Sequence, residues 1–491
     1  MESWIYISGI SLAFSIPGLL FAYYSVILFL STFRYPRSLP EGPFPRDPPF
    51  VSILIATFNE KFVIAHTLEA IRTLDYPRDK LLVLIADDSS DETVEVIDKR
   101  LLELNRLGIQ SVVSRRKGRA GFKSGALNHA APLLKGDYVL LLDADSTVSA
   151  DVLKRGLSAT SHDPRIGFVS FRVGNYNREQ NLTTRLFALQ LDQGDTVSKM
   201  GAYSIDAPYS FQGGFVLISM AVLRQVGFWS NDSIVEDADL SCKIYCAGYR
   251  GVYLSDVRIF SEDPSSLEVW KKQAARVAQG WAKCAIANGP KILKCKNLSV
   301  WRRIVLFSTL VGPFQGLSWV VVTFVSALGL IFGLSAPSNS IFSSPVYIII
   351  VTLPVLSFFA SGVYALHIQK IMSPHNLVLL PLLSYTSSCM TTAIMIGFLN
   401  GIRGKTGFFF RTPKHGLMTD GDKQYHRDIR LDRIAIAEGA LAVLALAMSM
   451  FVLLDGVWAL ALTLAGFGTL TLKSMNLSKN LKTVRPLYSN N

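Results

Sequence analysis

The stretch Asp137-Tyr138-Val139-Leu140-Leu141-Leu142-Asp143-Ala144-Asp145 decides the fold that this sequence predicts. Four apolar residues in a row, preceded by Gly136 and bounded by acids, are typical of a short buried strand. Two carboxylates, Asp143 and Asp145, then stand where the strand should end. Ligands collect at the carboxyl ends of strands in open α/β sheets, and hard oxygen ligands suit Mg²⁺ or Mn²⁺. The stretch therefore predicts a metal site for a diphosphate, with two surface acids capping a turn as the alternative.

Composition favours a membrane-associated protein. Half of the 491 residues are hydrophobic, the net charge is +12 and the mean hydropathy is +0.32, which is high for a soluble protein. In membrane proteins an excess of basic residues usually lines the cytoplasmic face. No basic helix or aromatic–basic platform supports nucleic-acid binding. The five cysteines have no metal-ligand spacing with histidines, which fits a reducing cytosolic setting.

Residues 1–33 are predicted to form a transmembrane helix. No charged residue occurs from Ser3 to Phe33, a length that exceeds a signal-peptide core and suits one crossing of a bilayer. Because Arg34 and Arg37 follow, the positive-inside rule places the amino terminus outside. Residues 34–300 are then expected to be a cytosolic domain that begins with a proline-rich linker.

Strand and helix patterns alternate in this domain. Strands are expected at residues 51–56, 81–86 and 110–114 and around Val139, with amphipathic helices between them. Alternation at this spacing is typical of a parallel, doubly wound α/β sheet. Polar clusters follow the strands, so we expect them to converge on one edge of the sheet.

Eight motifs occur in order along the chain. They are Thr57-Phe-Asn-Glu60, Asp87-Asp88, Lys123-Ser-Gly-Ala-Leu-Asn128, Asp143-Ala-Asp145, Phe211-Gln-Gly-Gly214, Val235-Glu-Asp237, Gln273-x-x-Arg276 and Arg411-Thr-Pro-Lys414. From Val51 to about Lys414 the chain resembles the membrane-integrated members of glycosyltransferase family 2, the group of cellulose synthase, plant mannan and glucomannan synthases and hyaluronan synthase. The resemblance implies a GT-A-type, Rossmann-like domain inserted between transmembrane helices, an inverting transfer and a divalent metal.

The motifs at the first two strands are expected to hold the nucleotide. Thr57, Asn59 and Glu60 are assigned to substrate binding by the resemblance. Asp88 follows the second strand, where it can accept hydrogen bonds from a base or ribose, or can cap the next helix. The resemblance places Asp87 or Asp88 on the nucleotide, and we favour Asp88.

Lys123 lies in a basic run with Arg115, Arg116, Lys117 and Arg119. Such a run is usually a solvated surface. Three interleaved glycines, however, let the backbone approach an anion closely. We expect Lys123 to contact the nucleotide or the diphosphate.

The acidic motifs are expected to carry the chemistry. By resemblance, Asp143 and Asp145 hold the metal, or the sugar and metal together, so that charge on the leaving diphosphate is neutralised. Asp237 matches the general base, which removes the proton of the acceptor hydroxyl as that hydroxyl attacks the anomeric carbon. Glu236 is assigned to substrate binding. A plain helix N-cap is the alternative for Asp237.

Phe211 and Gly213 open an apolar segment that the resemblance places near the acceptor terminus. Glycines there allow close approach of a ligand or another backbone, and a simple bulge is the alternative. Both residues are assigned to substrate binding.

Gln273 and Arg276 lie on one face of a helix expected over residues 269–287. A guanidinium forks onto paired oxygens, so Arg276 suits a diphosphate. The family pattern has a tryptophan directly after this arginine, and this chain has Val277 there. Trp281 or Trp270, one turn away, could replace the ring that stacks on the acceptor sugar, and of the two we assign Trp281 to substrate binding.

Residues 301–475 are predicted to form the second membrane region, ahead of a cytosolic tail at 476–491. Spans are expected at about 317–334, 345–366, 434–454 and 457–472, and an interfacial or re-entrant segment at 376–402. Residues 403–430 resemble the gating loop of cellulose synthase, from which Thr412 and Lys414 could reach the diphosphate; an ordinary basic surface loop is the alternative.

The sequence thus predicts a multi-pass enzyme of the cell membrane with its catalytic domain in the cytosol. The expected activity is transfer from a nucleotide-diphosphate sugar to a growing β-linked polysaccharide. Because Val277 departs from the family pattern, transfer of one sugar to a lipid or lipid-linked acceptor is the second hypothesis. A transporter or receptor with a degenerate enzyme domain is the third, and the intact acidic motifs speak against it.

Overall fold

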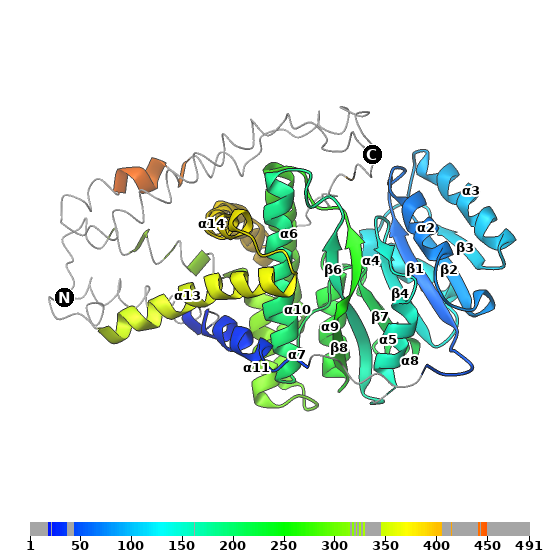
Figure 1. Ribbon diagram of the computed structural model, residues 1–491, viewed down its shortest axis with the longest axis horizontal. Helices are drawn as coiled ribbons and strands as arrows, with labels where there is room; N and C mark the ends of the chain where they lie inside the picture. Colours follow the sequence, from blue (N-terminus) through cyan, green and yellow to red (C-terminus); the bar gives the residue numbers. More distant parts are fainter. Residues whose placement is uncertain are drawn as a thin grey trace.

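The architecture is that of a central sheet with helices on both faces and a further helical layer beyond (Figure 1). The computed structural model describes residues 18–20, 22–36, 44–161, 163–314, 345–404, 414 and a few positions within 317–328 and 440–448. Residues 18–20 and 22–32 are helical. The strands are β1 (Val51–Thr57), β2 (Leu81–Asp87), β3 (Gln110–Arg115), β4 (Tyr138–Asp143), β5 (Thr147–Val148), β6 (Ile166–Asn175), β7 (Val216–Ser219) and β8 (Arg250–Ser261). The helices are α2 (Ile64–Arg72), α3 (Thr93–Arg106), α4 (Phe122–Ala130), α5 (Val152–Thr160), α6 (Leu182–Gly194), α7 (Gly201–Ser204), α8 (Met220–Gln225), α9 (Glu236–Cys246), α10 (Leu267–Lys294), α11 (Val300–Val311), α13 (Pro345–Ile368) and α14 (Pro374–Ile402). Short turns η1 (Arg78–Lys80) and η2 (Ala131–Leu133) and a π-helical turn η3 (Asp195–Met200) connect them.

The sheet is mixed, which corrects the expectation of a purely parallel one. Within the described residues its order is β3-β2-β1-β4-β7-β6-β8-β5. The first four strands are parallel, as their spacing predicts. β7 then runs antiparallel to both β4 and β6, and β5 runs antiparallel to β8. Strand direction depends on the path of the connecting segments, and no local pattern in the four residues of β7 encodes it.

Alternation along the strands builds a core on each face of the sheet. On β1, Leu54 joins one buried cluster with α4 and α9, whereas Ile53 and Ile55 join another with α2, α3 and α5. All three side chains are fully buried. Because successive residues of a strand point to opposite faces, a strand covered on both sides needs the continuous apolar run that this chain has.

A third layer of helices covers α10 and α6 on the side away from the sheet (Figure 1). α14 packs along α10, and α13 packs on α6. Two glycines of α14 permit the first contact: a Cβ at Gly397 would lie 2.1 Å from the Ala275 carbonyl oxygen, and one at Gly401 would lie 2.5 Å from that of Gln279. The predicted segment 376–402 is thus one continuous helix held against α10.

The membrane predictions concern residues that the structure describes only in part. Within the described residues, no helix is both long and apolar enough to cross a membrane. The span expected at 345–366 falls within α13. The spans at 317–334, 434–454 and 457–472, the tail at 476–491 and the gating-type loop at 403–430 lie largely or wholly outside the described residues.

Candidate active site

The polar residues that follow β1, β2 and β4 meet at one edge of the sheet, as predicted. Parallel register sets Thr57 beside Asp87 and Ala56 beside Asp143. A cleft with a cavity volume of about 190 Å³, open to solvent, lies there. The predicted site residues that line it are Thr57, Glu60, Asp88, Lys123, Asp143, Asp145, Gln273, Arg276 and Lys414. Eight motifs spread over more than 350 residues therefore contribute to a single cavity or to its immediate support.

Two consecutive backbone amides join the most important acids. The Gly213 amide donates to Asp237 Oδ2 at 2.8 Å, and the Gly214 amide donates to Asp143 Oδ2 at 3.3 Å. Adjacent amide nitrogens lie within about 4 Å of each other, so the two carboxylates are on the order of 10 Å apart at most. A proton can pass from an acceptor to Asp237 beside a donor held at Asp143.

Asp237 is not the N-cap that the sequence left as an alternative. It is the second residue of α9, whose N-cap is Val235 and has no side-chain capping bond. Asp237 Oδ1 accepts a hydrogen bond from the next backbone amide, that of Ala238. Burial, followed by the neighbouring charge of Glu236, raises the pKa of Asp237 to about 6. A carboxylate of that pKa can take up a proton near neutral pH.

Lys123 bridges the two acidic motifs. Its Nζ lies 2.7 Å from Asp143 Oδ1 and 2.7 Å from Glu236 Oε1. Burial alone would lower the pKa of Lys123, but the charges of both carboxylates outweigh it and hold that pKa above its usual range. The same ammonium lowers the pKa of Asp143 against the opposing effect of burial. Both groups are therefore charged at neutral pH.

Lys414 forms the corresponding pair with Asp145. Its Nζ donates to Asp145 Oδ2 at 2.6 Å and to the Glu262 carbonyl oxygen at 2.8 Å. The Glu262 amide also donates to Asp145 Oδ2, at 2.8 Å. Lys414 thus reaches the cleft, and the alternative of a plain surface loop does not fit its placement. Thr412 lies outside the described residues.

The structure separates Asp88 from Asp87. Asp87 is fully buried and pairs with Arg115, whereas Asp88 lines the cleft. Arg116 Nε and Nη2 each lie 2.8 Å from an Asp88 oxygen. The Arg119 guanidinium stacks over the Phe58 ring, 3.2 Å from its centroid.

Asp88 therefore anchors a basic and aromatic wall rather than capping α3. Arg116 and Arg119 belong to the basic run, in which only Lys123 was expected to contact the nucleotide or the diphosphate, and Phe58 was not among the expected site residues. The run of arginines beside glycines was the signal for this wall.

Gln273 and Arg276 face the cleft from α10, as their spacing predicts. Gln273 Oε1 is buried and has no hydrogen-bond partner within the described residues. Burial lowers the pKa of Arg276 although Glu236, Asp237 and Asp143 oppose it. The guanidinium therefore lies in the electrostatic field of all three acids.

Several predicted residues are not among those that line the cleft. Gly213, Glu236 and Asp237 support the lining through the contacts described above. Phe211, Asn59 and the two tryptophans of α10 have other surroundings. Phe211 is buried in the core, where its ring centroid lies 5.0 Å from that of Phe168. Asn59 links the loops that follow β1 and β2. Its backbone amide donates to Ser89 Oγ, and its side-chain Oδ1 accepts from the Ser90 backbone amide. Trp270 is buried against Phe187, and half-buried Trp281 packs on the core.

Asp143 and Asp145 offer carboxylate oxygens where each already holds an ammonium group. Within the described residues no group of three or more His, Cys, Asp or Glu side chains could hold a metal. The pair nevertheless fits a divalent cation whose remaining ligands come from a diphosphate and water, as is usual for Mg²⁺.

Curated relatives of this chain include plant enzymes, each of which is matched over only part of its length. Glucomannan 4-beta-mannosyltransferase 2 of Arabidopsis thaliana is 29% identical over 265 residues, 53% of this chain and 50% of its own. Glucomannan 4-beta-mannosyltransferase 1 of Oryza sativa subsp. japonica is 29% identical over 260 residues, 52% of this chain and 50% of its own. The chain spans about half the length of these relatives.

A solved structure shares the fold. It is the mannosyltransferase PcManGT from Pyrobaculum calidifontis in complex with GDP-Man and Mn²⁺, with a TM-score of 0.53 and 19% identity, covering 81% of this chain and 99% of that one. The fold is accordingly the mixed α/β, Rossmann-like GT-A fold. A family model described as glycosyl transferase family group 2 matches residues 138–399, more than half of the chain. This protein therefore belongs to glycosyl transferase family group 2.

Proposed function

We propose that this protein is an inverting membrane glycosyltransferase that extends a β-linked polysaccharide from a cytosolic nucleotide-diphosphate sugar. The observation that carries the proposal is the pair of adjacent amides at Gly213 and Gly214, which hold Asp237 beside Asp143. The names of the curated relatives make a mannosyl donor the first to test. The location in the cell membrane rests on the uncharged stretch from Ser3 to Phe33 and the basic residues that follow it.

The donor would lie along the cleft. Asp88 and the stacked Arg119 and Phe58 suit the nucleoside, because a carboxylate accepts hydrogen bonds and an aromatic face stacks on a base. Thr57 and Glu60 line the same side. Lys123, Arg276 and Lys414, which all line the cleft, would then face the diphosphate.

Asp237 would act as the general base. It takes the proton of the acceptor hydroxyl while that oxygen bonds to the anomeric carbon and the bond to the diphosphate breaks. One displacement inverts the carbon. Arg276 and Lys123 stabilise charge on the leaving group by forked and single ionic hydrogen bonds. When bound at Asp143 and Asp145, Mg²⁺ or Mn²⁺ would supply Lewis-acid neutralisation of that charge.

A lipid or lipid-linked acceptor that receives one sugar is the second candidate. Val277 replaces the tryptophan of the family pattern, Trp270 is buried, and Trp281 is not among the cleft-lining residues. No tryptophan of α10 therefore offers a sugar platform in the cleft.

Replacing Asp237→Asn should abolish transfer while nucleotide binding persists, because the amide cannot accept the proton. We expect a loss of at least about 100-fold in transfer rate. Radiolabelled transfer and binding of the nucleoside diphosphate would be measured on the same preparation. Asp75→Asn, at an exposed acid paired with Lys154, is the control for charge loss. Transfer by the Asp237 variant within tenfold of wild type would contradict the role.

Removal of divalent cations should stop donor turnover, and Mn²⁺ or Mg²⁺ should restore it. Asp145→Asn removes one of the two ligand charges, so the Mn²⁺ concentration for half-maximal donor hydrolysis should rise about tenfold or more. The measurement is a metal titration of chelated protein. Full hydrolysis in chelator would refute metal use and would also leave the third hypothesis, a degenerate domain, unsupported.

The rate of transfer at saturating donor should rise with pH, reach half of its maximum near pH 6, and level off above that pH. Below that pH the Asp237 carboxyl is protonated and cannot act as a base. Glu236→Gln removes the charge that, after burial, raises the pKa of Asp237 most, so the midpoint should move to lower pH. Exposed Glu69→Gln should leave the midpoint where it is. An unchanged midpoint in the Glu236 variant would contradict the assignment of the titrating group.

Membranes incubated with labelled GDP-mannose and a panel of other nucleotide sugars should yield an ethanol-insoluble polymer. A β-specific glycanase should digest it. The label could instead extract into organic solvent, in a lipid product that carries one added sugar. That result would establish the second candidate in place of the first.

A further inference from the structure

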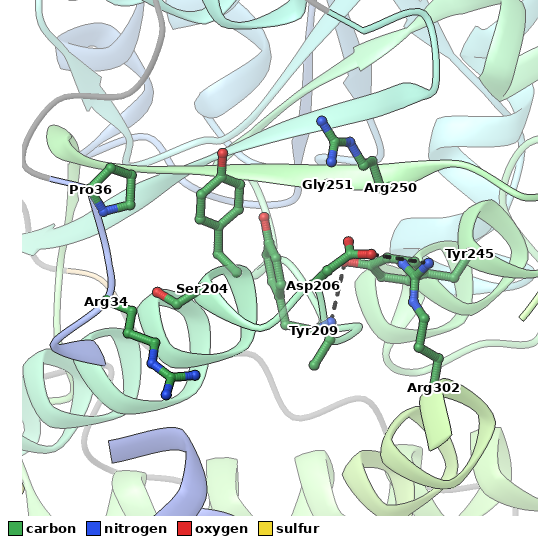
Figure 2. A pocket seen from close by; sticks show the side chains of 11 residues that line it. Arg34, Pro36, Ser204, Asp206, Tyr209, Tyr245, Arg250, Gly251 and Arg302 are labelled. Carbon is green, nitrogen blue, oxygen red and sulfur yellow. Dashed lines mark hydrogen bonds and ion pairs between the residues drawn. The ribbon is translucent and has the colours of Figure 1, made fainter. Parts of the chain in front are cut away.

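Figure 2 shows a second pocket. It lies at the opposite end of the strands from the active-site cleft. β8 is parallel to β6, and both β6 and β4 are antiparallel to β7, so β8 runs in the direction of β4. The active cleft lies at the carboxyl end of β4, whereas Arg250 begins β8 at the amino-terminal edge. The two pockets share no lining residue.

Three arginines from separate segments line this pocket. Arg34 follows the helix over residues 22–32, Arg250 begins β8, and Arg302 lies in the first turn of α11. The acid among the lining residues is Asp206 (Figure 2). Three charges contributed by distant parts of the chain make the pocket strongly cationic, which a folded protein retains only against a cost in repulsion.

The existing partners satisfy two of these guanidinium groups only in part. Arg302 Nη1 lies 3.6 Å from Asp206 Oδ2, beyond hydrogen-bond distance, and Arg250 Nη2 lies 3.0 Å from Asp163 Oδ2. The Nε atoms of both arginines are buried and have no hydrogen-bond partner within the described residues. A buried N–H without a partner is unfavourable, so both groups favour a ligand with acceptor oxygens.

Phenol groups and a strained turn complete the pocket. Tyr203, Tyr209 and Tyr245 line it, and burial raises the pKa of Tyr203, so its hydroxyl stays protonated and can donate. Asp206 has a left-handed backbone with φ of 51°, and its side chain is 63% exposed. The acid that screens Arg302 is therefore at the mouth, where an incoming anion can displace it.

We propose that this arginine pocket binds a phosphomonoester group. Guanidinium forks match phosphate oxygens, and the three lining arginines outnumber the acids in contact with them, Asp206 and Asp163. The phosphate can belong to an anionic lipid headgroup or to a soluble phosphate. Arg34 and Arg302 flank the segments expected to enter the membrane, which makes a lipid source consistent with the proposed membrane location. The pocket itself does not depend on the proposed function.

Binding would be measured on the full-length protein in neutral detergent by thermal shift and by calorimetric titration. One arm uses inorganic phosphate, and the other uses short-chain phosphatidic acid, with phosphatidylcholine of equal chain length as reference. Stabilisation by both ligands assigns a soluble phosphate site, and stabilisation by phosphatidic acid alone assigns a lipid site. No response to either ligand would overturn the proposal.

Arg250→Gln with Arg302→Gln should weaken phosphate-ligand binding at least tenfold, whereas Arg100→Gln, a surface arginine paired with Glu103, should not change it. Asp206→Asn removes the competing carboxylate at a backbone position that asparagine tolerates, so it should tighten binding at least threefold. This gain does not depend on whether the arginine variants fold. Equal weakening by Arg100→Gln, or no gain from Asp206→Asn, would refute the site. Binding of the nucleoside diphosphate should be the same in all these variants, even if the proposed transfer reaction proves wrong.

Discussion

The active site depends on the two amides at Gly213 and Gly214. Antiparallel pairing of Leu141 with Val216 brings this turn against the end of β4. A Cβ at Gly214 would lie 2.1 Å from the Asp143 amide nitrogen, and one at Gly213 would lie 2.9 Å from Asp143 Oδ2. Since real Cβ atoms do not approach so closely, only glycine lets the turn lie flat on the strand end and donate to two carboxylates at once. The motif therefore acts through its backbone, and Phe211 anchors it from within the core.

Charge balance in the cleft follows from this arrangement. Asp143 and Asp145 would repel each other and a diphosphate, but Lys123 and Lys414 each neutralise one of them. A carboxylate held by an amide and an ammonium remains ionised although it is buried. When a diphosphate and a cation enter, the lysines can transfer their hydrogen bonds to phosphate oxygens while the acids turn to the cation. Under the proposed function, the site would therefore take up an anion and a cation together.

The strands β1 to β4 and the acids at their ends were predictable because local periodicity encodes both. The direction of β7 and the strand β8 were not, since tertiary contacts fix them. Asp87 and Asp88 follow the same strand, and their separate partners, Arg115 and Arg116, become visible only when β3 is placed. Trp270 had the right helical spacing for the cleft, yet it packs against Phe187, because spacing specifies a face of a helix and not its neighbour.

The position of Arg276 is set from both sides of α10. Toward the sheet, a Cβ at Gly280 would lie 2.5 Å from Val235 Cγ1, so α10 lies directly on the segment that begins α9 and carries Asp237. On the other side, Gly397 and Gly401 seat α14 against the same helix. Closely packed helices move as units because their interfaces do not deform continuously. Contacts on both sides of α10 therefore fix the position of Arg276 relative to Asp237, so the separation of these two side chains depends on both helix interfaces.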